Sequence, residues 1–395
     1  MAPTRRRCRR RWRRSAPGWK SGCERAAPAR GRPSPGARRA GSDRVSASRE
    51  AVAPQFASDN NAGICPEALE ALIDANVGHA AGYGDDRWTA DAEDAVRAVF
   101  DVDAPVYFVF NGTAANSLAL AAICRNTDAV ICHAFAHVNV DECGAPEFFS
   151  GGAKLLTVDT PHAKLTTDAI TSRAGVAHGE HASRPRAMSL TQATELGAVY
   201  SPDELRVLTD HAHGLGLKVH MDGARFANAV AALGCAPAQM AGRAGIDVLS
   251  FGGTKNGLPF GEAIVFFDAA LADEFARRRK QGGQLASKMR FLAAPWSAVL
   301  RSGAWLRHAA HANAMARRMA DAIAQVRGAA FIAPTEANGV FVHLPPPVIR
   351  GLQDRGWRFY VFVGETGCRF MCAWDTPPAA VDRFCADIRE LARDA

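Results

Sequence analysis

Long apolar runs and paired cysteines are both missing from this 395-residue chain. A helix needs about 20 consecutive apolar residues to cross a bilayer, whereas runs such as residues 263–267 soon end at a charged side chain. The ten cysteines are scattered, with no C-x-x-C pair and no spacing suited to a zinc site. We therefore expect no membrane span, no disulfide scaffold and no metal centre, but a cytoplasmic protein with reduced thiols.

Acidic residues are scarce in the first 50 positions. That segment holds 16 basic side chains and three acidic ones, whereas the rest of the chain holds 31 basic and 37 acidic ones. The formal net charge of +7 therefore combines a tail of +13 with a body of −6. Since the basic charge belongs to the tail, it does not indicate an acidic partner for the body.

The tail, taken as residues 1–52, is rich in Arg, Ala, Pro, Gly and Ser without apolar periodicity, which predicts disorder. Its arginines and Trp12 could bind nucleic acid, or its acid-poor composition could mark a transit peptide. We favour a third interpretation, in which the segment lies upstream of the working protein. No Met occurs between Met1 and Met188, so a later start would use the codon of Val45 or Val52.

The body alternates short apolar runs with amphipathic stretches, which predicts an α/β fold with a mostly parallel sheet flanked by helices. The expected strands lie at residues 106–110, 129–132, 154–158, 187–190, 218–221, 248–251 and 263–267, and the clearest helices at 66–76, 89–100, 114–124 and 202–215. Thr89 is the expected cap of the second helix.

The body of the chain is too long to fold around a single hydrophobic core. We expect a large domain at 53–295 and a smaller α+β domain at 296–395, which begins with one long linking helix at 296–326. Its expected strands lie at 339–344, 359–363 and 369–372, before a closing helix at 378–393.

Several polar groups follow predicted strands, where ligands bind in open α/β sheets. Gly112 and Thr113 begin a helix directly after a strand, a position that suits a phosphate. Asp222 ends another strand, and Lys255 stands on a glycine-flanked loop after a third. His133 and His137 offer flat rings.

Together these groups suit pyridoxal 5'-phosphate. The lysine amine would attach the cofactor, and the carboxylate would keep its pyridine nitrogen protonated so that the ring accepts electrons. Each feature alone has a plainer explanation, as a helix cap, a turn or a solvated lysine. Their order along the chain favours the cofactor.

The motifs that carry a family resemblance are FASDN (56–60), YGDD (83–86), FNGTAAN (110–116), AHV (136–138), DECGA (141–145), HMDGARF (220–226), FGGTKNG (251–257), GQLASKMR (283–290) and CRF (368–370). From about residue 56 to its C-terminus the chain resembles the low-specificity L-threonine aldolases, pyridoxal phosphate enzymes of the aspartate aminotransferase superfamily. The resemblance implies that Lys255 holds the cofactor, that Asp222 pairs with its pyridine nitrogen, that Gly112 and Thr113 bind its phosphate and that His137 stacks on its ring.

The resemblance also implies the substrate contacts. Ser58, Arg225 and Arg369 would hold the substrate carboxylate, which arginine binds bidentately. Tyr83 and Arg290 would reach the phosphate from a neighbouring subunit, which implies a homodimer or homotetramer with shared active sites. His181 would lie near the substrate hydroxyl group, and either His181 or His137 would be the general base. Glu142, in the same motif set, could equally be a helix-surface residue.

One stretch departs from the family pattern. Many family members have Glu-Asn-Thr before the Asp strand, where this chain has Thr191-Gln192-Ala193. We expect Gln192 to contact the cofactor near its ring oxygen.

The implied reaction is the retro-aldol cleavage of L-threonine, L-allo-threonine or related L-3-hydroxy-α-amino acids to glycine and an aldehyde. Two alternatives remain open. Another reaction of the same cofactor, such as β-elimination or transamination, would use the same groups, and a nucleic-acid-binding factor would act through the tail.

Overall fold

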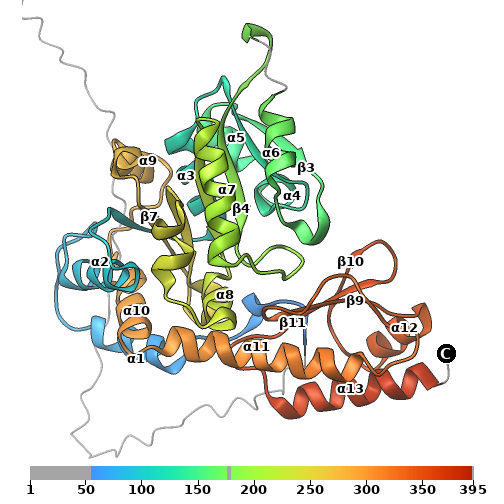
Figure 1. Cartoon of the computed structure of the whole chain (residues 1–395). Helices are drawn as coiled ribbons and strands as arrows, with labels where there is room; N and C mark the ends of the chain where they lie inside the picture. The colour runs from blue at the N-terminus through green and yellow to red at the C-terminus, as the bar shows by residue number, and fades with distance from the viewer. Residues whose placement is uncertain (1–54, 176–178, 394–395) are drawn as a thin grey trace, which may run out of the picture. The chain divides into compact units, whose positions relative to one another are not determined.

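The computed structural model describes residues 55–175 and 179–393 (Figure 1). The predicted tail at 1–52 lies outside the described residues. Within these residues, no helix is long and apolar enough to span a membrane.

The larger sheet has seven strands in the order β1-β7-β6-β5-β4-β2-β3. Strand β7 runs antiparallel to both β1 and β6, and the pairs from β6 to β3 are parallel. The predicted α/β fold with a mostly parallel sheet is therefore confirmed. The strands are β1 (Val106–Val109), β2 (Asp128–His133), β3 (Lys154–Val158), β4 (Arg184–Thr191), β5 (Lys218–Gly223), β6 (Val248–Gly252) and β7 (Glu262–Phe266).

Apolar side chains cover both faces of this sheet, because successive residues of a strand point to opposite sides. Val248 and Ile264 pack with α3 on one face, whereas Leu249 and Val265 pack in the core that contains α2, α8 and α10. The helices before the second sheet are α1 (Pro66–Ala75), α2 (Arg87–Phe100), α3 (Gly112–Ile123), α4 (His137–Val140), α5 (Ala145–Ser150), α6 (Thr167–Ala174), α7 (Pro202–Gly214), α8 (Phe226–Leu233), α9 (Phe275–Gln281), α10 (Arg290–Arg301) and α11 (Ala304–Ile323).

The second sheet is antiparallel, in the order β10-β11-β9-β8. Figure 1 shows α11 and α13 side by side below it. Phe56, from the start of the described chain, joins this core, with ring centroids 4.9 Å from Phe384 and 5.7 Å from Trp357. The elements are β8 (Ala330–Phe331), β9 (Gly339–His343), α12 (Pro346–Asp354), β10 (Tyr360–Val363), β11 (Gly367–Met371) and α13 (Pro378–Arg393).

Two predicted helix details are wrong. The single helix expected at 296–326 is two helices, α10 and α11, because Gly303 takes the left-handed conformation (φ 68°) that ends one and begins the next. Helix α2 begins at Arg87, before Thr89, because the buried carboxylate of Asp86 caps it and accepts a hydrogen bond from the Thr89 N–H at 2.9 Å.

Candidate active site

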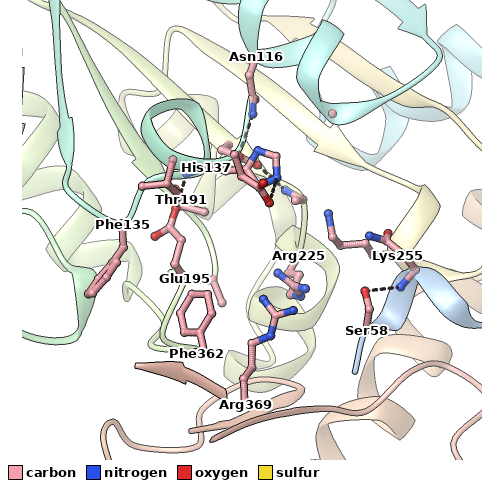
Figure 2. Close-up of a pocket in the computed structure, with 17 residues that line it drawn as sticks. Ser58, Asn116, Phe135, His137, Thr191, Glu195, Arg225, Lys255, Phe362 and Arg369 are labelled. Carbon is pink, nitrogen blue, oxygen red and sulfur yellow. Dashed lines mark hydrogen bonds and ion pairs between the residues drawn. The ribbon is translucent and has the colours of Figure 1, made fainter. Parts of the chain in front are cut away.

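A pocket of about 170 Å³ lies where the central parallel strands end (Figure 2). Thr191 ends β4, Asp222 lies near the end of β5 and Lys255 follows β6, so these three residues lie together at the carboxyl edge of the sheet. Arg369 comes from β11 of the second sheet, and Ser58 from the segment before α1. The predicted residues that line the pocket are Ser58, Gly112, His137, Asp222, Arg225, Lys255 and Arg369.

The N-terminus of α3 lies at one wall of the pocket. Asn111 caps the helix by accepting a hydrogen bond from the Ala114 N–H at 2.8 Å. The N–H groups of Gly112 and Thr113 have no acceptor within the helix, because they belong to its first turn. A Cβ added at Gly112 would have no protein atom within 4 Å. This wall thus offers both hydrogen-bond donors and space to a phosphate.

A buried polar network holds Asp222. Its Oδ2 accepts a hydrogen bond from Asn116 Nδ2 at 2.8 Å, and its Oδ1 accepts one from the Ala224 N–H at 2.9 Å. Asn116 Nδ2 also donates to Glu142 Oε1 at 2.9 Å, and that oxygen lies 2.8 Å from His137 Nδ1. The hydrogen bond with Glu142 raises the pKa of His137, although burial opposes this. The network thus links the Asp222 and Glu142 carboxylates with the His137 ring.

The loop that presents Lys255 is held from both sides. The Gly253 N–H donates to Glu262 Oε2 at 2.6 Å, and Asn256 Nδ2 donates to the Trp305 carbonyl at 2.7 Å. A Cβ at Gly253 would lie 2.5 Å from Leu258 Cδ1 and 2.6 Å from Trp296 Cζ2. Only glycine fits such a close approach, so the backbone of the loop that carries Lys255 has a fixed position.

The two arginines of the pocket differ in charge balance. Arg225 pairs with the buried Asp59 through Nε–Oδ2 at 2.7 Å and Nη2–Oδ1 at 2.9 Å. Burial would raise the pKa of Asp59, but this ion pair outweighs it and lowers that pKa. Arg369 has no acidic partner within 4 Å among the described residues, and its guanidinium lies 5.0 Å from the ring centroids of Tyr360 and Phe362. Arg369 is therefore the guanidinium that an incoming carboxylate can engage.

Other predicted residues lie outside this pocket. Thr113 is in the first turn of α3 but does not line the pocket. Tyr83 is 53% exposed, and Arg290 donates to the Gly78 carbonyl at 3.4 Å. His181 is exposed in a short turn, next to residues outside the described ranges.

Gln192, which we expected beside the cofactor ring, does not line the pocket. Its amide donates to the Tyr200 carbonyl at 2.8 Å and accepts from the Tyr200 N–H at 3.0 Å, so both ends are used within the protein and the residue is fully buried. The neighbouring Thr191 and Glu195 line the pocket instead.

Sequence reasoning missed several further lining residues. Asn116 lies within the FNGTAAN motif, four positions after Gly112, so helical spacing could have identified it. Glu195, Phe135 and Phe362 belong to loops or to the second sheet and carry no local signal.

The donor set fits pyridoxal phosphate. A helix N-terminus with free N–H groups suits the phosphate, Asp222 and its partners suit a protonated ring nitrogen, and the fixed Lys255 suits a covalent link. Fold and site together define a pyridoxal phosphate-dependent α/β enzyme.

Comparison with known proteins narrows this class. Residues 55–345 match the model of the beta-eliminating lyase family. The low specificity L-threonine aldolase of Pseudomonas aeruginosa is 57% identical over 86% of this chain and 96% of its own length, and that of a Pseudomonas species is 55% identical over 85% and 97%. The chain therefore belongs to the beta-eliminating lyase family and, within it, to the low-specificity L-threonine aldolases.

A solved structure agrees with this placement. Leishmania major threonine aldolase superposes with a TM-score of 0.81 at 27% identity, over 86% of this chain and 99% of that one.

Proposed function

We propose that this protein is a pyridoxal phosphate-dependent lyase that cleaves L-threonine, L-allo-threonine and related L-3-hydroxy-α-amino acids to glycine and an aldehyde. Family membership supports the reaction. The observation that carries the proposal is the convergence of Lys255, Asp222 and Arg369 on one pocket, since these groups suit the amine, the cofactor ring and the substrate carboxylate.

The cofactor, when bound, supplies an electron sink for the pair released when the Cα–Cβ bond breaks. Lys255 would hold it covalently through its amine. Asp222 would keep the ring nitrogen protonated, and a hydrogen bond to such a charged group contributes about 1.5–3 kcal/mol. Asn116 and Ala224 orient this carboxylate by donating to its two oxygens.

Arg369 binds the substrate carboxylate as a charge-assisted, bidentate partner. Ser58 and Arg225 border the same space, but the charge of Arg225 is already balanced by Asp59. His137, with Glu142 behind it, presents its ring to the pocket for stacking.

We further propose a cytoplasmic homodimer or homotetramer, each subunit with a large domain and a small C-terminal domain. The boundary expected at 295/296 falls inside α10, whose residues on both sides of that point pack in the core of the large sheet. The eight described cysteines are free, as a reducing compartment would keep them. Tyr83 and Arg290 lie outside the pocket of their own chain, which leaves them available to complete that of a neighbour.

Product analysis tests the function. With L-threonine and no keto acid, the wild-type protein should form glycine and acetaldehyde in equal amounts, and Lys255→Ala should form neither. The family name favours β-elimination as a second candidate. That reaction would release ammonia and a 2-oxo acid from L-threonine, and finding these products without glycine would refute the proposal.

A further inference from the structure

Glu195 is a pocket carboxyl group without an assigned role. It lies on the loop that follows β4. Two hydrogen bonds between the side-chain amide of Gln192 and the backbone of Tyr200 close this loop. Its Oε1 accepts hydrogen bonds from Thr191 Oγ1 at 2.6 Å and from the His137 N–H at 3.2 Å. Its Oε2 is buried and has no partner among the described residues. Two donors thus hold one oxygen of this pocket-lining carboxyl group, while the other has no hydrogen-bond partner among the described residues.

The surroundings of Glu195 favour proton exchange near neutral pH. Burial raises its pKa to about 7, and the negative charge of Asp222 acts in the same direction. The donors Thr191 and His137 N–H only partly oppose this shift, and Arg225 is the cation that interacts with it at longer range. Among the described residues, Glu195 forms no salt bridge that would favour its ionised form, since Arg225 pairs with Asp59.

The position of Glu195 suits the side chain of the substrate. Figure 2 shows Glu195 on the side of the pocket away from Lys255, with Arg225 and Arg369 between them. Phe135 and Phe362 lie on the same side as Glu195. A substrate held by its amine at Lys255 and its carboxylate at Arg369 leaves this region for its third carbon and hydroxyl group.

The sequence-based candidates for the proton acceptor fit this task less well. His137 bonds Glu142 through Nδ1, and its Nε2 lies 3.6 Å from Asp141, so both ring nitrogens face carboxylates. The hydrogen bond with Glu142 raises the pKa of His137, which favours the protonated ring over the form that could accept a proton. His181 does not line the pocket.

We propose that Glu195 is a catalytic acid–base residue that takes the proton of the substrate's 3-hydroxyl group; this role rests on the proposed aldolase function. As the Cα–Cβ bond breaks, the O–H bond breaks too, its proton moves to the carboxylate and its electron pair forms the aldehyde C=O bond. The substrate loses one proton at its hydroxyl group and gains one at Cα when glycine forms. The reaction therefore balances without a co-reactant.

Glu195→Gln tests this role with little change of shape. A glutamine oxygen still accepts from Thr191 and His137, but the amide cannot take a proton. We expect kcat for L-threonine to fall by about 10²–10⁴-fold, with KM within about 3-fold of wild type. The acidic limb of the kcat/KM profile near pH 7 should disappear. Glu70→Gln, an exposed carboxyl on α1, should leave both parameters unchanged.

A second measurement does not depend on turnover. In cofactor-free protein, an infrared difference spectrum between pH 5 and pH 9 should show a protonated carboxyl band that is smaller in Glu195→Gln than in wild type. Glu262, also buried with a pKa raised to about 7, contributes equally to both and cancels in the subtraction. Glu195→Asp, which keeps a carboxylate, should retain more activity than Glu195→Gln and keep the acidic limb.

Retention of at least one third of the wild-type kcat in Glu195→Gln would overturn the role, as would an unchanged acidic limb or identical infrared spectra. A Glu195→Gln protein that binds cofactor poorly, with equal losses in Glu195→Asp, would also overturn it, in favour of a structural role. If wild type itself yields no glycine from L-threonine, the proposed function fails first, which distinguishes the two failures.

Discussion

At the scale of single residues, a buried ion pair determines which cation of the pocket is free. Asp59 neutralises Arg225, accepts a further hydrogen bond from Asn338 Nδ2 at 3.0 Å and is almost wholly buried. Arg369, by contrast, has no acidic partner among the described residues. The FASDN motif therefore contributes Ser58 to the pocket lining and, one position later, the carboxylate that pairs with Arg225.

Asp59→Asn should destabilise the fold strongly, because it leaves the Arg225 charge buried and unpaired. We expect a loss of about 3–5 kcal/mol in the free energy of unfolding, measured by denaturant titration at pH 7. Asp94→Asn, which breaks an exposed pair with Arg97, should cost less than about 1 kcal/mol.

The pH dependence of this loss has a definite sign. The folded-state pKa of Asp59 lies below the unfolded value of about 3.9. The pair therefore stabilises the protein fully above that value, and its contribution is lost as the pH falls through the lowered pKa. The difference between wild type and Asp59→Asn should shrink below about pH 4; a constant difference would contradict the assignment.

Among the secondary-structure elements of the site, Gly253 and Gly112 differ in what surrounds them. A Cβ at Gly253 would meet Leu258 and Trp296, whereas one at Gly112 would meet no protein atom and would project into open space at the helix terminus.

We expect Gly253→Ala to lower the free energy of unfolding by about 1–3 kcal/mol through overpacking. Gly112→Ala should unfold like wild type but bind pyridoxal phosphate at least 10-fold more weakly, by fluorescence titration of the cofactor-free protein. Normal cofactor affinity in Gly112→Ala would argue against a phosphate at this helix.

Elements with strong local signals could be predicted from the sequence. The strands that carry Asp222 and precede Lys255 are short apolar runs that end in polar or glycine residues, and helix α13 begins and ends where its pattern predicts. The break at Gly303 was missed because a single glycine inside an amphipathic stretch does not reveal its φ angle. Glu195 was missed because its place depends on a loop closed by Gln192 and Tyr200, a tertiary contact without a local pattern.

In the whole molecule, different residues determine the net charge of the chain and the positive charge of the pocket. The tail sets the basic pI, while the cations of the pocket are Lys255, Arg225 and Arg369.

Removing residues 1–52 should therefore leave kcat and KM for L-threonine within about 2-fold of the full chain, since the family match begins at residue 55. Steady-state kinetics of both forms checks this. A loss of activity on truncation would instead give the tail a functional role.

Shared active sites predict complementation between inactive variants. In a hybrid dimer of Lys255→Ala and Arg290→Ala subunits, one site would receive both defects and the other neither. Unfolding and refolding an equal mixture should restore about a quarter of the wild-type activity. Activity no higher than the sum of the two separate variants would show that each site is built from one chain.

The proposed function requires that Lys255 carries pyridoxal phosphate in this pocket. Reduction of the holoenzyme with borohydride, followed by peptide mass analysis, locates the attachment. We predict that the reduced cofactor adds its mass to the peptide containing Lys255. Attachment to any other lysine, or to none, would show that Lys255 does not hold the cofactor.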